Sequence, residues 1–278
     1  MADQMLTQEE QQYAIRTWRY IRIAMVALVA MLAVAIVYEH FKAHCYLQSL
    51  SASYYTPVHS IFVVTEVGIG LCLMCVKASN QWEEVALNIA GGTAPLIGFV
   101  PKPTVDGCAS HLEGVADRTA NIGNNVIAYL VITGLALAIL LVHRIFWVRR
   151  QGLGLAKPGT IGYLIAVAAW TVALVGYLAS TTTFDHDAHY IASGVTALGM
   201  VVVIGINAFE TKITGIYGRL ALAALVALVV MFVAKLAGWQ YWLLGLETSL
   251  AVAFAAFWLI QTHELWDQGV RRRPAASP

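Results

Sequence analysis

Charged residues are scarce in this chain: Asp, Glu, Lys and Arg together make up 12% of its 278 residues. A soluble protein of ordinary composition carries about a quarter of such residues, whereas 59% of this chain is hydrophobic and its mean hydropathy is +0.69. The formal net charge of +1 leaves no surplus of basic residues for binding a nucleic acid. The composition therefore indicates a membrane protein and no nucleic-acid partner.

Several nucleotide-binding and catalytic motifs are also missing. The sequence contains no G-x-x-x-x-G-K-[ST] phosphate-binding loop, no G-x-G-x-x-G fingerprint and no G-x-S-x-G nucleophile motif. No long polar domain interrupts the hydrophobic sequence either. These absences argue against an ATP-driven pump and against a standalone serine esterase.

Hydrophobic residues are concentrated in eight segments separated by short polar joints. Each segment approaches the roughly 20 residues that an α-helix needs to cross a bilayer, although the second and third need flanking residues to reach that length. We therefore predict an all-α bundle of eight transmembrane helices, folded as a single domain over residues 1–278. The predicted spans are residues 22–38, 61–76, 85–100, 126–146, 161–179, 190–209, 220–236 and 243–260.

The positively charged residues divide unevenly between the two sides of this predicted bundle. If the N-terminus lies inside, 13 of the 17 Lys and Arg residues fall on the inner side. The remaining four fall outside and are Lys42, Lys102, Arg118 and Lys235. Because Lys and Arg are enriched in cytoplasmic loops, this distribution predicts that both termini are cytoplasmic.

Two short segments flank the predicted spans. Thr7 and Glu10 have the spacing of a capping box, so we expect a helix over residues 1–20 that lies along the cytoplasmic interface. Residues 267–278 contain the run Arg271 to Arg273 followed by Pro-Ala-Ala-Ser-Pro. This composition indicates a basic, solvated cytoplasmic tail, with contact to anionic lipid as the alternative.

The four cysteines fall into two pairs. Cys45 and Cys108 lie in the first and second predicted outer loops, where the compartment permits disulfides. We therefore predict a Cys45–Cys108 disulfide, with two free thiols as the alternative. Cys72 and Cys75 have the C-x-x-C spacing of a redox or zinc motif, but inside an apolar helix this spacing favours simple packing.

Histidines gather on the predicted outer side. Asp185, His186 and His189 open the sixth predicted span, where residues three apart share a helix face, and His59 opens the second span at a similar depth. Together these four residues could form a zinc site. The alternative is an ordinary helix start, because Asp and other polar residues satisfy the free amides there.

Two acidic residues lie inside the predicted spans, namely Glu66 and Glu247. A carboxylate in hydrocarbon is costly and usually faces a cavity or a partner. One interpretation is an outward-facing polar pocket that binds a ligand. Its walls would be Tyr54, Tyr55, Glu66, Asn124, Asn125 and Glu247. The alternative is a protonated or ion-paired carboxylate, for example Glu247 paired with Lys235.

The two halves of the sequence share a few landmarks. His59 and His189 open the second and sixth spans, and His143 and His263 close the fourth and eighth. If the halves are repeats, two histidine pairs could each hold a haem and form a transmembrane electron path. Haem is therefore a further cofactor candidate beside zinc.

Several short motifs resemble known families. The runs Ser53-Tyr54-Tyr55-Thr56-Pro57 and Asn88-Ile89-Ala90-Gly91-Gly92-Thr93-Ala94-Pro95 resemble a set of uncharacterised multi-span membrane proteins of actinobacteria. This resemblance implies a bacterial plasma-membrane location and no particular activity. Ser53 with the four zinc candidates is distantly similar to alkaline-ceramidase-like hydrolases, which implies zinc chemistry. The zinc candidates named here do not have the H-x-x-x-H spacing of those seven-span enzymes.

Three classes of function follow from these features. In the first, a non-enzymatic membrane protein binds or passes a lipid or small amphiphile in its outward-facing pocket, so membrane lipids are its partners. In the second, a zinc-dependent hydrolase acts on a lipid at the outer leaflet, with water activated by the metal. In the third, the chain is an accessory subunit of a membrane complex, and a His-ligated haem protein is a further alternative. The candidate protein partners are a second copy of the chain or another subunit of a membrane complex.

Overall fold

The structure of the protein is a computed structural model that describes residues 8–103, 118–151 and 158–271. Helices make up nearly all of these residues, and no strand occurs among them. The α-helices are α1 (Gln8–Ala43), α2 (His59–Cys75), α3 (Gln81–Phe99), α4 (Arg118–Gln151), α5 (Pro158–Ala179), α6 (Thr181–Thr211), α7 (Ile216–Leu236) and α8 (Trp242–Glu264). A short 3-10 helix, η1 (Ser51–Tyr55), precedes α2.

Each of the eight predicted spans corresponds to one of these helices, although residues 76 and 100 lie just past the ends of α2 and α3, and this confirms the all-α fold. Six helices, α1 and α4 to α8, are long and apolar enough to cross a membrane, which makes the chain a multi-pass membrane protein. The short apolar α2 has 17 residues. The 19-residue α3 carries Glu83 and Glu84 in its first turn and is not among the six.

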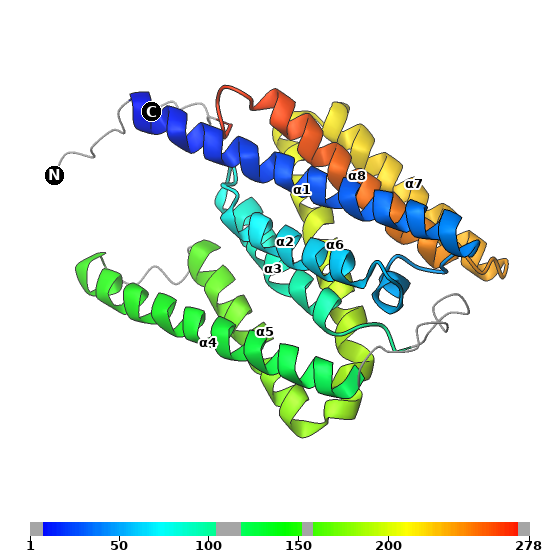
Figure 1. Cartoon of the computed structure of the whole chain (residues 1–278). Helices are drawn as coiled ribbons and strands as arrows, with labels where there is room; N and C mark the ends of the chain where they lie inside the picture. The colour runs from blue at the N-terminus through cyan, green and yellow to red at the C-terminus, as the bar shows by residue number, and fades with distance from the viewer. Residues whose placement is uncertain (1–7, 104–117, 152–157, 272–278) are drawn as a thin grey trace.

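Helices α3 and α6 pack against each other in antiparallel fashion at the centre of the molecule. Helix α2 lies beside α3, and α1, α7 and α8 pack together on one side (Figure 1). Helices α4 and α5 form a hairpin on the other side, where they contact α3 and α6. The central pair therefore connects two groups of helices that lie apart from each other.

Three polar contacts at different levels align α3 with α6. Asn207 Nδ2 donates to Glu83 Oε1 at 2.7 Å near one end, and the hydroxyls of Thr93 and Thr196 lie 2.8 Å apart in the middle. At the other end, His189 Nδ1 lies 2.8 Å from the carbonyl oxygen of Val100, which follows α3. Polar contacts of this kind hold membrane helices together where the hydrophobic effect is absent.

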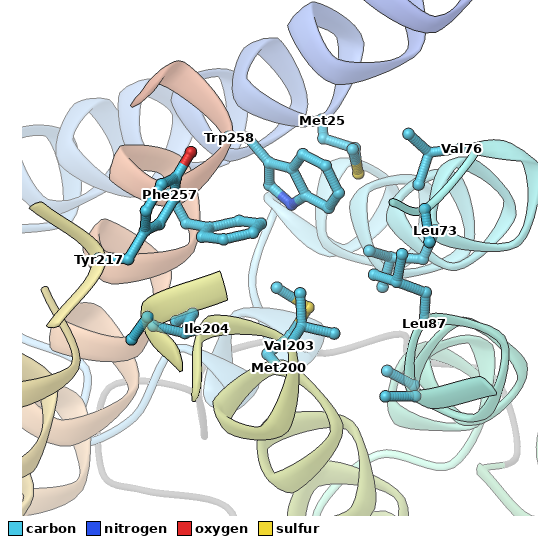
Figure 2. Packing of buried hydrophobic residues seen from close by; sticks show 14 residues of the cluster. Met25, Leu73, Val76, Leu87, Met200, Val203, Ile204, Tyr217, Phe257 and Trp258 are labelled. Carbon is cyan, nitrogen blue, oxygen red and sulfur yellow. The ribbon is translucent and has the colours of Figure 1, made fainter. Parts of the chain in front are cut away.

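The largest cluster of buried apolar side chains joins five helices around α6. Figure 2 shows Met25 of α1 and Trp258 of α8 directed toward side chains from α2, α3 and α6. Phe257 and Trp258 pack edge to face, with ring centroids 5.0 Å apart. This cluster fixes α1 and α8 against the central helices near one end of the bundle.

The two ends of the bundle differ. We call the end where α1 begins and α8 finishes the terminal end, because both described chain ends lie there (Figure 1). The opposite end, which includes η1 and the start of α8, is called the η1 end. The expected interfacial helix of residues 1–20 is, from Gln8 onward, the first part of the continuous helix α1.

Glycine allows α2 and α3 to approach closely. A Cβ added to Gly70 would lie 2.7 Å from the carbonyl oxygen of Gly91, and one added to Gly91 would lie 2.6 Å from that of Gly70. Small residues at such contacts let the backbones of membrane helices meet. The neighbouring Gly92, by contrast, has open space where a Cβ would stand.

We expect Gly91→Ala to lower the thermal stability of the purified protein, because overpacking typically costs about 1–3 kcal/mol. Gly92→Ala is the matched control and should unfold at the wild-type temperature, since its Cβ would meet nothing within 4 Å. Thermal unfolding of both variants in one detergent checks the prediction. An equal loss of stability in the two variants would contradict the α2–α3 contact.

Candidate functional site

At the η1 end, Glu247 of α8 caps the start of η1. Its carboxylate accepts hydrogen bonds from the backbone amide of Leu50 at 2.5 Å, the amide of Ser51 at 3.4 Å and the Ser51 hydroxyl at 3.0 Å. Carboxylates are favoured at helix N-termini because the free amides there carry partial positive charge. Glu247 thus ties α8 to η1.

The two tyrosines predicted to line the pocket are buried. Tyr54 and Tyr55 are 2% and 6% exposed and pack with apolar residues of α1, α2 and α3. The Tyr55 hydroxyl donates to the carbonyl oxygen of Lys102 at 2.7 Å, and the Lys102 ammonium donates to Ser49 Oγ at 3.3 Å. These contacts anchor η1 to the segment that follows α3.

The remaining pocket candidates are distributed over different helices. Glu66 of α2 is half-buried beside Gly98 of α3 and close enough to Glu247 for an electrostatic interaction. Asn124 is exposed and Asn125 half-buried on α4, whose main packing partners are α3 and α5. The structure therefore brings the two carboxylates near each other but does not gather all six residues around one opening.

The zinc candidates are held by separate partners. His59 Nδ1 lies 2.8 Å from the carbonyl oxygen of Tyr54, whereas His189 Nδ1 faces that of Val100. His186 Nδ1 contacts the Asp187 carboxylate at 2.5 Å, and Asp185 is only 9% exposed. Within the described ranges, no three His, Cys, Asp or Glu side chains could hold a metal ion together. The zinc site predicted from His59, Asp185, His186 and His189 is therefore not assembled.

The inner histidine pair proposed for haem is separated. His143 and His263 are both exposed, on α4 and α8 respectively, and these two helices lie on opposite sides of the central pair (Figure 1). A single haem cannot bridge them in this arrangement. The structure therefore does not bring His143 and His263 together, and haem binding stays an untested hypothesis.

The predicted disulfide involves a residue outside the described part of the chain, because Cys108 is not described. The described free thiols are Cys72, which is half-buried, and Cys75, which is exposed. Cys45 is not among them. The Cys45–Cys108 disulfide stays a prediction.

Two surface pockets flank the second half of α1. The first, about 730 Å³ in volume, is a groove between α1 and the start of α2. It is lined by Ala27, Ala30, Met31, Val34, Ala35, Tyr38, Glu39, Lys42, Pro57, Val58 and Ile61. The second, of about 500 Å³, lies between the end of α1 and η1 and includes His40, Tyr46 and Tyr55. Glu39 and Pro57 line both, so the pockets adjoin.

The groove is apolar over most of its length and polar at one end. Ala27 lies 15 residues before Lys42, which corresponds to about 22 Å along a helix axis. Tyr38, Glu39 and Lys42 stand at the η1 end of this groove, and the other lining residues are apolar. This distribution matches an amphiphile, with an apolar tail along α1 and a polar group at the end of the helix.

A second polar region, at the terminal end, was missed by the sequence analysis. Glu83 of α3, Asn207 of α6 and Gln261 of α8 are 1%, 0% and 3% exposed. Gln261 Nε2 lies 3.5 Å from Glu83 Oε1 and 3.3 Å from Asn207 Oδ1, which completes a three-helix hydrogen-bond cluster. Buried groups that bond to one another in this way specify a single arrangement of the helices.

The segment after α8 crosses this cluster and reaches α1. Arg19 donates to the carbonyl oxygen of Trp266 at 2.5 Å and stacks on its ring at 3.9 Å, while Arg22 donates to the carbonyl oxygen of Gly269 at 2.7 Å. We call residues 265–271 the strap. The backbone amide of Arg271 donates to Ser79 Oγ at 3.2 Å, so the strap also contacts the α2–α3 loop.

Arg271 departs from the expectation of a solvated tail, because it is partly buried against the bundle. Its guanidinium donates to both carboxylate oxygens of Glu264 and to Asn207 Oδ1. Burial by itself would lower the pKa of Arg271, but the hydrogen bonds to Glu264 outweigh it and raise the pKa above its ordinary value. Residues 272–278 of the predicted tail lie outside the described residues.

One sequence signal could have revealed the terminal cluster. Asn80 followed three residues later by Glu83 has the spacing of a helix start, and Asn80 Oδ1 indeed accepts from the amides of Trp82 and Glu83. Glu83 lies just before the predicted span of residues 85–100, so the sequence analysis did not consider it as a buried residue. Asn207 and Gln261 are uncharged and therefore did not stand out in apolar segments.

Comparison with known proteins adds no relative. The chain matches no protein-family model, no curated protein and no solved structure. The two resemblances noted in the sequence therefore receive no support from these comparisons.

We expect Glu247→Ala to loosen η1, because the amides of Leu50 and Ser51 lose their acceptor, and an unsatisfied buried donor costs about 1–3 kcal/mol. Hydrogen exchange of residues 49–55 should become faster than in the wild type. Thr248→Ala, at the exposed next position of α8, is the control and should leave this exchange unchanged. Unaltered protection in Glu247→Ala would refute the capping role.

Proposed function

We propose that the protein binds a membrane lipid, or a similar amphiphile, in the groove between α1 and α2. The observation that carries this proposal is the groove itself, which is apolar along α1 and ends at Tyr38, Glu39 and Lys42. A bilayer lipid changes from apolar to polar in the same order along its length, from an acyl chain to a charged headgroup. The proposal keeps the ligand class expected from the sequence but moves the site to α1.

The dimensions of the groove support an outer-leaflet lipid. The roughly 22 Å between the levels of Ala27 and Lys42 exceeds half of the approximately 30 Å hydrocarbon core. An acyl chain lying in the groove therefore extends to about the middle of the bilayer, while its headgroup lies at the level of Lys42. The adjoining pocket around His40 and Tyr46 offers further polar contacts at the same level.

The charges at the η1 end of the groove favour a zwitterionic or phosphate-bearing headgroup. Lys42 is exposed and Glu39 half-buried, one turn apart on α1. Lys binds phosphate as a point charge, and a carboxylate accepts hydrogen bonds from an ammonium group. Tyr38 is exposed beside them, and tyrosine is enriched at the membrane interface.

We further propose that α2 and α3 complete eight spans and that both termini face the cytoplasm of a bacterial plasma membrane. The distribution of Lys and Arg supports this orientation. It places the terminal end in the cytoplasm and the η1 end outside. Packing of α2 and α3 between longer apolar helices supports their insertion despite their length.

A fluorescent protein that matures only in the cytoplasm tests this topology in bacterial cells. Fused after Pro278, it should fluoresce. Inserted after Gly238, at the exposed α7–α8 turn, it should not, because the positive-inside rule places this turn outside. Fluorescence of the Gly238 insertion combined with a dark C-terminal fusion would reverse the orientation.

The lipid proposal predicts that filling the groove removes lipid from the purified protein. Ala30→Phe should retain several-fold less lipid in native mass spectrometry, because the new ring occupies the space of the chain. Ala223→Phe, at another exposed alanine on α7, should retain as much as the wild type. Equal lipid content in both variants would contradict the proposal.

Lys42→Gln separates the headgroup from the chain. It should weaken retention of phosphate-bearing lipids while leaving neutral lipids unaffected, since the variant loses only a charge. If retention of both lipid classes falls equally, Lys42 shapes the groove and does not select the headgroup.

A further inference from the structure

The strap places one guanidinium group in a complete set of contacts at the terminal end. Arg271 Nε and Nη2 donate to Glu264 Oε1 and Oε2 at 2.9 and 2.7 Å. Its Nη1 donates to Asn207 Oδ1, and the guanidinium carbon lies 4.8 Å from the centre of the Tyr217 ring. A bidentate carboxylate, an amide oxygen and an aromatic face together provide the contacts that recognise a planar cation.

These contacting groups are held in place by bonds that do not involve Arg271. The Tyr217 hydroxyl donates to Glu264, and Asn207 donates to Glu83 and to the carbonyl oxygen of Val203. Tyr217 is 1% exposed and Asn207 is fully buried. The contacting groups are therefore positioned by α3, α6, α7 and α8, whereas the guanidinium comes from the segment that follows these helices.

The charges of the site favour a cation when Arg271 is absent. Two carboxylates belong to this site. Glu264 bonds directly to the guanidinium of Arg271, and Glu83 accepts a hydrogen bond from Asn207. Arg22 also interacts electrostatically with both carboxylates, but it donates its hydrogen bond to the carbonyl oxygen of Gly269. Withdrawal of Arg271 would leave an excess of negative charge in a partly buried site, which is costly without a partner.

The site is accessible from outside the bundle. The side chains of Arg271 and Glu264 are 15% and 37% exposed, whereas Asn207 and Gln261 behind them are buried. The strap is joined to α8 through turns, and only its Gly269 adopts a positive φ, of 72°. A soluble cation can therefore approach along the path that the Arg271 side chain follows.

We propose that the contacts of Glu264, Asn207 and Tyr217 form a receptor for one guanidinium group, filled in this structure by the chain's own Arg271 and open to small guanidinium compounds when Arg271 is withdrawn. The strap acts as a tethered ligand at high effective concentration. Free guanidinium compounds therefore bind weakly in competition with it, and tightly enough to measure once the tethered group is removed.

The test is chemical rescue of the full-length Arg271→Ala variant. The variant should unfold at a lower temperature than the wild type because Glu264 loses its cation. Methylguanidinium at millimolar concentrations should raise its unfolding temperature by a few degrees in a saturable manner, since a ligand that binds only the folded state stabilises it. The wild type, whose receptor is filled, should respond much less.

Urea is the matched control ligand because it has nearly the shape of guanidinium but no charge. It should give no rescue at the same concentrations. Rescue by urea, or an equal response of the wild type to methylguanidinium, would show a general solvent effect and overturn the proposal. No response of Arg271→Ala to methylguanidinium would overturn it as well.

Two further variants test the receptor itself. Adding Glu264→Gln to Arg271→Ala should abolish the rescue, because the bidentate acceptor is lost; undiminished rescue in the double variant would place the binding elsewhere. If Arg271→Ala is not obtained folded, Arg271→Lys keeps a positive charge but lacks the planar fork. It should then show a smaller, saturable response, and no response would overturn the proposal.

Discussion

The antiparallel pairing of α3 with α6 is the constraint on which the other helices depend. Its polar contacts at Glu83, Thr93 and Val100 meet partners on α6 at three separate levels. A shift of α6 by one residue would separate all three at once. Apolar contacts with lipid cannot supply such a register, because lipid tails solvate an apolar helix as well as another helix does.

The two sides of the molecule attach to this pair in different ways. On one side, Gly70 and Gly91 bring α2 against α3, and the cluster around Trp258 and Met25 adds α1 and α8 (Figure 2). On the other side, the hairpin of α4 and α5 rests on a smaller cluster that includes Val126 and Phe184. The α1–α2 groove and the contacts of Arg271 both lie on the first side, toward opposite ends of α1.

The sequence was sufficient to predict the helices and insufficient to predict the sites, for a physical reason. An apolar helix consists of consecutive apolar residues, so the segments 22–38 and 243–260 can be recognised from neighbouring positions alone. The partner of a buried polar residue is not recorded in that way, since Glu83 and Asn207 are 124 residues apart. For Tyr54 and Tyr55 the sequence predicted a polar site where the structure has an apolar one. Their polar neighbours in the sequence suggested an open pocket, but η1 directs both rings into the apolar cluster with Phe62 and Leu32.

The strap also makes the order of synthesis relevant to folding. Chains emerge with their N-terminal part first, so α1 with Arg19 and Arg22 and α3 with Glu83 are made long before residues 265–271. Until Arg271 follows α8 out of the ribosome, the carboxylate of Glu264 lacks its guanidinium and the arginines of α1 lack the carbonyl oxygens of Trp266 and Gly269. The bundle can therefore close at its terminal end only after all eight helices have been synthesised, which couples assembly to completion of the helical chain.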